Sequence, residues 1–113
     1  MSDKKAAGVV RPEVPDALSE EVAELMLERL RSRAQKHGPG AYAGPHEILG
    51  VLEEEFIELK LSITANTDSE TAAELMDIAV GCIFGIASLI VTRRVRFEYV
   101  ATENGPKAVW LGT

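Results

Sequence analysis

The sequence contains a single cysteine, Cys82, among its 113 residues, and acidic side chains outnumber basic ones. One cysteine excludes an intrachain disulfide and a metal site made of several thiolates. The apolar neighbours of Cys82 predict that it is buried, which is compatible with a reducing cytoplasm. The 12 Lys and Arg against 18 Asp and Glu give a formal net charge of −6, which argues against nucleic acid or an anionic membrane as a partner.

Several common functional motifs are missing as well. There is no glycine-rich loop of the Walker type, so a P-loop is excluded. The two histidines, His37 and His46, do not form the Glu-x-x-His pairs of a ferritin-like di-iron site. The most apolar run, 78–91, has 14 residues, fewer than the ~20 that span a bilayer. We therefore expect a core helix there and no membrane span, and, without an apolar signal core in the first ten residues, a cytoplasmic protein.

The length fits one domain, and a hydrophobic content of 46% excludes disorder of the whole chain. Pro12 and Pro15 interrupt regular helix near the N-terminus, so residues 1–15 are expected to form a flexible tail. Residues 16–113 are expected to form a single helical domain.

The spacing of apolar residues predicts two helices in the first half of this domain. Intervals of three and four predict a helix from Ser19, with Ser19 or Asp16 as its N-cap, that ends at the Gly-Pro-Gly segment 38–40. A second helix is expected to start at Pro45, since proline is favoured in a first turn, and to reach Lys60 or slightly further.

A third helix is expected from Ser69 to about residue 92 or 94, with Thr67 or Asp68 as its N-cap. A short turn joins it to the second helix, so the two should pack as an antiparallel hairpin. The predicted fold class is therefore all-α, an antiparallel helical bundle. Three helices in so short a chain cannot cover a third helix that is apolar on nearly all sides, so we expect a homodimer or homotetramer to complete the bundle.

The C-terminal segment allows two structures. Val95, Phe97 and Tyr99 alternate with polar residues, which is typical of a strand. The dipeptide Asn104-Gly105 would then turn the chain back into a β-hairpin. The same dipeptide, followed by proline, would equally end a fourth helix, and both structures remain open.

Carboxylates on the second and third helices suggest a site. Apolar residues of the second helix share one face, namely Ile48, Leu52, Phe56 and Leu59. Glu55 lies beside that face and Glu58 one turn further on, while Glu74 and Asp77 share a face of the third helix. Across an antiparallel hairpin these two pairs face each other at similar height, and their repulsion would be relieved by a hard cation, Mg²⁺ or Mn²⁺. The alternative is that Glu55 only edges the core and pairs with an arginine of the first helix.

Gly81, Gly85 and Ser88 follow Asp77 along the same stripe of the third helix. Because glycine has no Cβ, another backbone can approach closely there. Tight packing of helices, within the chain or between copies, is the simplest explanation of this stripe.

The order Glu55-x-x-Glu58, fifteen residues, then Glu74-x-x-Asp77 resembles the ExxE…ExxD signature of the MazG-like, all-α NTP pyrophosphatase superfamily. The resemblance covers about residues 38–92. It implies a helical bundle, usually oligomeric. It also implies Mg²⁺-dependent hydrolysis of nucleoside triphosphates to monophosphate and pyrophosphate, often for the removal of noncanonical or excess dNTPs.

The resemblance also implies roles for individual residues. Glu55, Glu58, Glu74 and Asp77 would be the metal ligands, and Glu55 would also belong to the catalytic residues. Glu54 would be a neighbouring carboxylate or the base that orients the attacking water. No residue matches the basic and asparagine residues that contact phosphate further along the chain in that family. This difference favours the alternative, a MazG-like module that binds nucleotide, metal or a partner helix without turnover.

Overall fold

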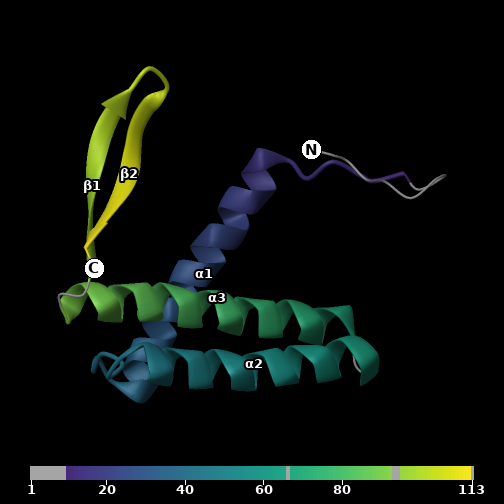
Figure 1. Cartoon of the computed structure of the whole chain (residues 1–113). Coiled ribbons are helices and arrows are strands. Elements are labelled where there is room, and N and C mark those ends of the chain that lie inside the picture. The colour runs from purple at the N-terminus through teal and green to yellow at the C-terminus, as the bar shows by residue number, and fades with distance from the viewer. Residues whose placement is uncertain (1–9, 66, 93–94, 113) are drawn as a thin grey trace.

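The computed structural model describes residues 10–65, 67–92 and 95–112. In these ranges the chain forms three α-helices followed by a two-stranded antiparallel hairpin (Figure 1). The elements are α1 (Asp16–His37), α2 (Pro45–Ala65), α3 (Asp68–Val91), β1 (Val95–Thr102) and β2 (Gly105–Gly112). The mostly helical prediction is confirmed, and of the two possible C-terminal structures the hairpin is present. The predicted flexibility of the tail concerns mainly residues 1–9, which lie outside the described residues.

α1 starts earlier than predicted and without a side-chain cap. It begins at Asp16, and the residue at its N-cap position is Pro15, so the prediction of Ser19 or Asp16 as the cap is wrong. The carbonyl of Pro15 accepts hydrogen bonds from the N–H groups of Leu18 (3.1 Å) and Ser19 (3.3 Å), which is enough to start the first turn. The helix ends as predicted at Gly38, whose φ of 80° is a conformation that favours glycine.

The antiparallel pairing of α2 and α3 is also present. α2 continues to Ala65, five residues beyond Lys60, and α3 begins directly after a short turn. Of the two predicted caps it is Thr67 that caps α3, because its side chain accepts a hydrogen bond of 3.4 Å from the N–H of Glu70. Figure 1 shows the two helices side by side along most of their length.

The glycine stripe of α3 packs against α2. A Cβ atom on Gly85 would lie 3.2 Å from Cγ2 of Ile48, and one on Gly81 would lie 3.5 Å from Cδ2 of Leu52. Both glycines are buried, as is Ser88 in the same stripe. The stripe therefore allows α2 and α3 to approach closely within one chain, which brings the carboxylates at the other end of the two helices together.

Few apolar side chains are buried in the described part of the chain. The buried hydrophobic residues are Tyr42 and Val80, whereas Phe56, predicted to face the core, is 48% exposed. The prediction of a buried Cys82 is wrong, since it lies on the side of α3 away from α1 and α2 and is exposed. The radius of gyration is 17.3 Å, against about 13 Å for a compact domain of this length. A single copy thus leaves much apolar surface uncovered.

α3 is long and apolar enough to cross a membrane by length and composition. The buried residues of α3 are Val80, Gly81, Gly85 and Ser88. The predicted core helix is therefore only partly covered by the rest of the chain. Core helices of soluble proteins pass the same test of length and composition.

The hairpin extends away from the helices (Figure 1). Thr102 pairs with Gly105, so a two-residue loop joins the strands, and Gly105 has a φ of 106°. On the hairpin the ring of Phe97 packs edge-on against the rings of Tyr99 and Trp110, with centroids 5.6 and 5.3 Å away. These aromatic side chains therefore stabilise the hairpin itself.

Candidate metal centre

Three of the four predicted metal ligands converge between α2 and α3. Glu55 and Glu58 lie three residues apart on α2, and Glu74 lies opposite them on α3. One carboxylate oxygen from each residue lies within 4.8 Å of the others. Three negatively charged groups at this separation repel one another unless a proton or a cation compensates them.

Two oxygens of this cluster have no partner among the described residues. Oε2 of Glu55 and Oε2 of Glu74 are buried and accept no hydrogen bond from any described residue. The alternative interpretation, that Glu55 pairs with an arginine of the first helix, is not found among the described residues, where Arg29 of α1 pairs with Asp77 instead. A buried carboxylate oxygen without a partner is costly, and a hard cation is the kind of partner that an all-oxygen cluster fits.

The electrostatics of the cluster also favour a compensating cation. Burial, and then the negative charges of Glu58, Asp77 and Glu74, raise the pKa of Glu55 above its ordinary value. Burial and the charges of Glu58 and Asp77 likewise raise the pKa of Glu74, while Arg29 opposes the rise. Both side chains thus resist ionisation, and a bound cation would remove this resistance.

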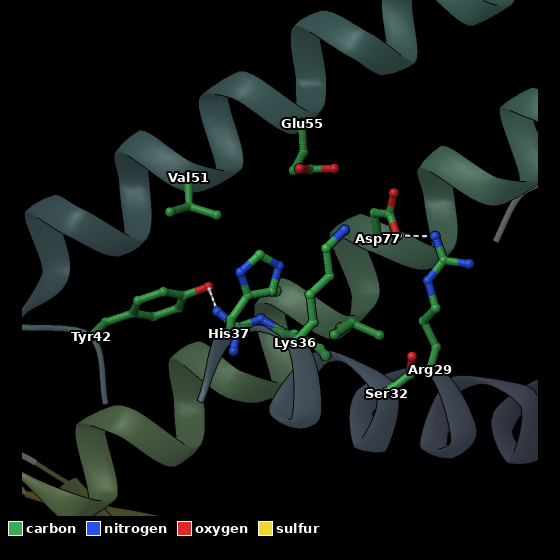
Figure 2. Close-up of a pocket in the computed structure, with 11 residues that line it drawn as sticks. Arg29, Ser32, Lys36, His37, Tyr42, Val51, Glu55 and Asp77 are labelled. Carbon is green, nitrogen blue, oxygen red and sulfur yellow. Dashed lines mark hydrogen bonds and ion pairs between the residues drawn. The ribbon is translucent and has the colours of Figure 1, made fainter. Parts of the chain in front are cut away.

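Asp77, the fourth predicted ligand, does not belong to the cluster of three. Its Oδ1 lies 2.6 Å from Nη2 of Arg29, which reaches it from α1 (Figure 2). Asp77 lies almost one turn after Glu74 on α3, so it remains close to the cluster while its charge is paired with Arg29.

A pocket of about 630 Å³ lies between α1, α2 and α3, beside the cluster. The residues that line it are Arg29, Ser32, Arg33, Lys36 and His37 from α1, Tyr42 from the loop before α2, Val51 and Glu55 from α2, and Asp77, Val80 and Gly81 from α3. The wall from α1 is therefore basic, and the facing walls carry Glu55 and Asp77 (Figure 2).

Tyr42 and Arg33 join the loop to α1 and α3 at one end of the pocket. The backbone N–H of Tyr42 donates to Oγ of Ser88 (3.0 Å), and its ring meets Phe84 edge-on at 5.0 Å between centroids. Arg33 donates from Nη2 to the Tyr42 hydroxyl (2.9 Å), and its Cζ lies 4.0 Å from the centroid of the Phe84 ring. Arg33 is thus held by a hydrogen bond and a cation–π contact.

Apart from one unspecified arginine of the first helix, the basic residues of the pocket were not predicted from the sequence, although a signal exists. Arg29, Arg33 and Lys36 are separated by four and three residues, so they share one face of α1. Glu54, a predicted catalytic residue, is exposed on α2 and lies outside the cluster of three, where its charge contributes to the raised pKa of Glu55. The role of Glu54 stays a prediction.

Comparisons of the chain with protein-family models, with curated proteins and with solved structures found no match. The functional argument therefore depends on the carboxylate cluster, the pocket beside it and the chemistry of their side chains.

Proposed function

We propose that the chain is a Mg²⁺-dependent pyrophosphohydrolase that cleaves nucleoside triphosphates to the monophosphate and pyrophosphate. One observation carries the proposal: oxygens of Glu55, Glu58 and Glu74 lie within 4.8 Å of one another, and two buried oxygens of the cluster lack a described partner. The adjacent pocket of about 630 Å³ is within the usual size range of small-molecule sites.

The donor set fits a hard cation. Carboxylate oxygens without nitrogen or sulfur ligands are typical of Mg²⁺ and Mn²⁺ sites. Glu55, Glu58 and Glu74 would hold the ion, and Asp77 would join them once Arg29 releases it. When bound, such a cation neutralises polyphosphate charge and lowers the pKa of a coordinated water.

Residues of the chain would position the attacking water and accept its proton. A water oxygen forms a bond to the α-phosphorus, the bond from that phosphorus to the bridging oxygen breaks, and pyrophosphate leaves with the electron pair. The proton of the water passes to a carboxylate, for which Glu54 and Glu55 are the candidates. The side chains of Val51 and Val80 in the pocket wall would limit the access of bulk water.

A product assay tests the proposal. With Mg²⁺ and a panel of dNTPs, we expect monophosphate and pyrophosphate from the wild type, and loss of turnover in Glu74→Gln and Asp77→Asn. Glu53→Gln is the matched control, because Glu53 is exposed on α2 outside the cluster. Release of single orthophosphate from the wild type would contradict the mechanism.

A second candidate function is binding without turnover, by a module that recognises Mg²⁺ with a nucleotide, or a partner helix. It is favoured by the ion pair of Asp77 with Arg29, which leaves three carboxylates in the cluster instead of four. Calorimetry that shows binding of Mg²⁺ and nucleotide, together with an absence of product, would select this function.

A further inference from the structure

The face of α1 that lines the pocket carries three cations in a protein whose net charge is −6. We propose that this cationic stripe, Arg29, Arg33 and Lys36, is a polyphosphate-binding wall that receives the phosphate oxygens of a triphosphate. The proposal rests on the proposed function, because the stripe faces the carboxylates that would hold the cation. It assigns to this chain the phosphate contacts for which the sequence offers no match.

The geometry places the three side chains around one cavity. Each of them lines the pocket, and Glu55 and Asp77 line its other walls. Figure 2 shows Lys36 extending from α1 into this space. A cationic wall opposite an anionic one suits a ligand whose own negative charge is shared between a cation and basic side chains. A triphosphate has that chemistry.

Arg33 is preorganised for such a ligand. One of its N–H groups donates to the Tyr42 hydroxyl at 2.9 Å, and its guanidinium lies over the ring of Phe84. A guanidinium has five N–H donors in a rigid fork that matches phosphate geometry, so further donors remain for a ligand. Because its position is already set, less conformational entropy is lost when a phosphate binds.

Arg29 has a different role, since its charge is paired with Asp77 at 2.6 Å. The two side chains are 47% and 33% exposed, and an ion pair in contact with solvent is weak and separates at small cost. When Asp77 turns to a cation, Arg29 is released and can bind phosphate. Arg29 therefore competes with the cation for Asp77 but assists the binding of the polyphosphate.

This dual role gives opposite signs for two ligands. Arg29→Gln removes the competitor for Asp77, so Mg²⁺ alone should bind more tightly to this variant than to the wild type. The same change removes a phosphate contact, so tripolyphosphate should bind more weakly. If the stripe only neutralised the carboxylates in the folded protein, Arg29→Gln would change the melting temperature. It would not strengthen the binding of Mg²⁺ and at the same time weaken the binding of tripolyphosphate.

The experiment is calorimetric titration of the full chain with inorganic tripolyphosphate in the presence of Mg²⁺, and with Mg²⁺ alone. We expect Lys36→Gln and Arg29→Gln each to weaken tripolyphosphate binding by about ten-fold, the typical effect of one charge-assisted hydrogen bond. The matched control is Arg31→Gln, an exposed arginine on α1 about 160° around the helix from Arg33, which should change the affinity less than about two-fold.

Each outcome has a defined meaning. The proposal is overturned if the wild type binds no tripolyphosphate, or if Arg31→Gln weakens binding as much as Lys36→Gln does. If Mg²⁺ alone does not bind, the proposed function fails, and a titration without Mg²⁺ then tests the stripe by itself. Tripolyphosphate binding that Lys36→Gln still weakens would in that case support the cationic wall independently of the metal.

Discussion

Glu55 and Glu74 each place a carboxylate oxygen without a described partner at the interface of α2 and α3. Packing alone would favour neutral side chains there, since burial and the neighbouring charges both oppose ionisation. Residues that lower stability and yet converge within 4.8 Å are best explained by a ligand that compensates them. We therefore propose that the stability of this interface depends on a bound cation.

Glu55→Gln should raise the melting temperature of the metal-free protein, because a neutral side chain of the same shape removes the repulsion. The same variant should lose stabilisation by Mg²⁺, which in the wild type reaches about 2.7 kcal/mol at a concentration one hundred times the dissociation constant. Thermal unfolding with EDTA and with Mg²⁺ measures both effects. Glu53→Gln should behave like the wild type, and a Glu55→Gln variant that keeps the Mg²⁺ response would refute the assignment.

The raised pKa values of Glu55 and Glu74 also predict a pH dependence. A carboxyl group with a raised pKa in the folded state stabilises the fold fully below its unfolded value near 4.5, and this contribution is lost as pH rises through the folded pKa. The melting temperature of the metal-free wild type should therefore fall, relative to the Glu55→Gln/Glu74→Gln variant, as pH rises above 4.5. Parallel pH profiles of the two proteins would contradict this.

At the level of helices and strands, the periodicity of the sequence predicted most of the helical structure. It did not predict which element the basic face of α1 contacts. α2 and α3, their antiparallel pairing and their glycine stripe follow from local signals in the sequence. The contact of Arg29 with Asp77 joins residues 48 positions apart. Helical spacing shows which residues share a face, but not which other element that face meets, so the basic wall was not foreseen. The prediction that Phe56 faces the core was wrong because this residue lies at the edge of the apolar face of α2.

The two buried glycines of α3 should respond differently to substitution. Gly81→Ala should stabilise the protein by about 0.5–1 kcal/mol, because alanine is the better helix former and its Cβ meets Leu52 at 3.5 Å, an ordinary contact. Gly85→Val should destabilise it by about 1–3 kcal/mol, because its side chain would overlap Ile48. Denaturant unfolding measures both values, and a stabilising Gly85→Val would disprove the close approach of the helices.

At the scale of the whole molecule, the uncovered apolar surface has a preferred location. Leu49, Phe56 and Ile63 recur every seven residues on α2 and are exposed. On α3 the exposed Leu75 and Ile86 lie about 180° around the helix from Phe84 and Asp77, respectively, which contact α1. The side of the α2–α3 pair away from α1 is therefore apolar, and a second copy of the chain is the partner that we propose for it.

Phe56→Glu should reduce the mass of the protein in solution from that of a dimer or tetramer to that of a smaller species, because a buried charge at an apolar interface is costly. Leu61→Glu is the matched control, since Leu61 is exposed on α2 about 140° away from Phe56. Sedimentation velocity measures both masses. A monomeric wild type would contradict the proposed self-association.

The central claim is that Glu55, Glu58 and Glu74 hold a hard divalent cation. The most direct test is titration of the metal-free protein with Mn²⁺, followed by electron paramagnetic resonance, which distinguishes free from bound Mn²⁺. We expect at least one bound Mn²⁺ per chain that Mg²⁺ displaces, and loss of that binding in Glu74→Gln but not in Glu53→Gln. A wild type whose Mn²⁺ remains entirely free, or a Glu74→Gln variant that binds it equally well, would show that the three carboxylates do not hold a cation.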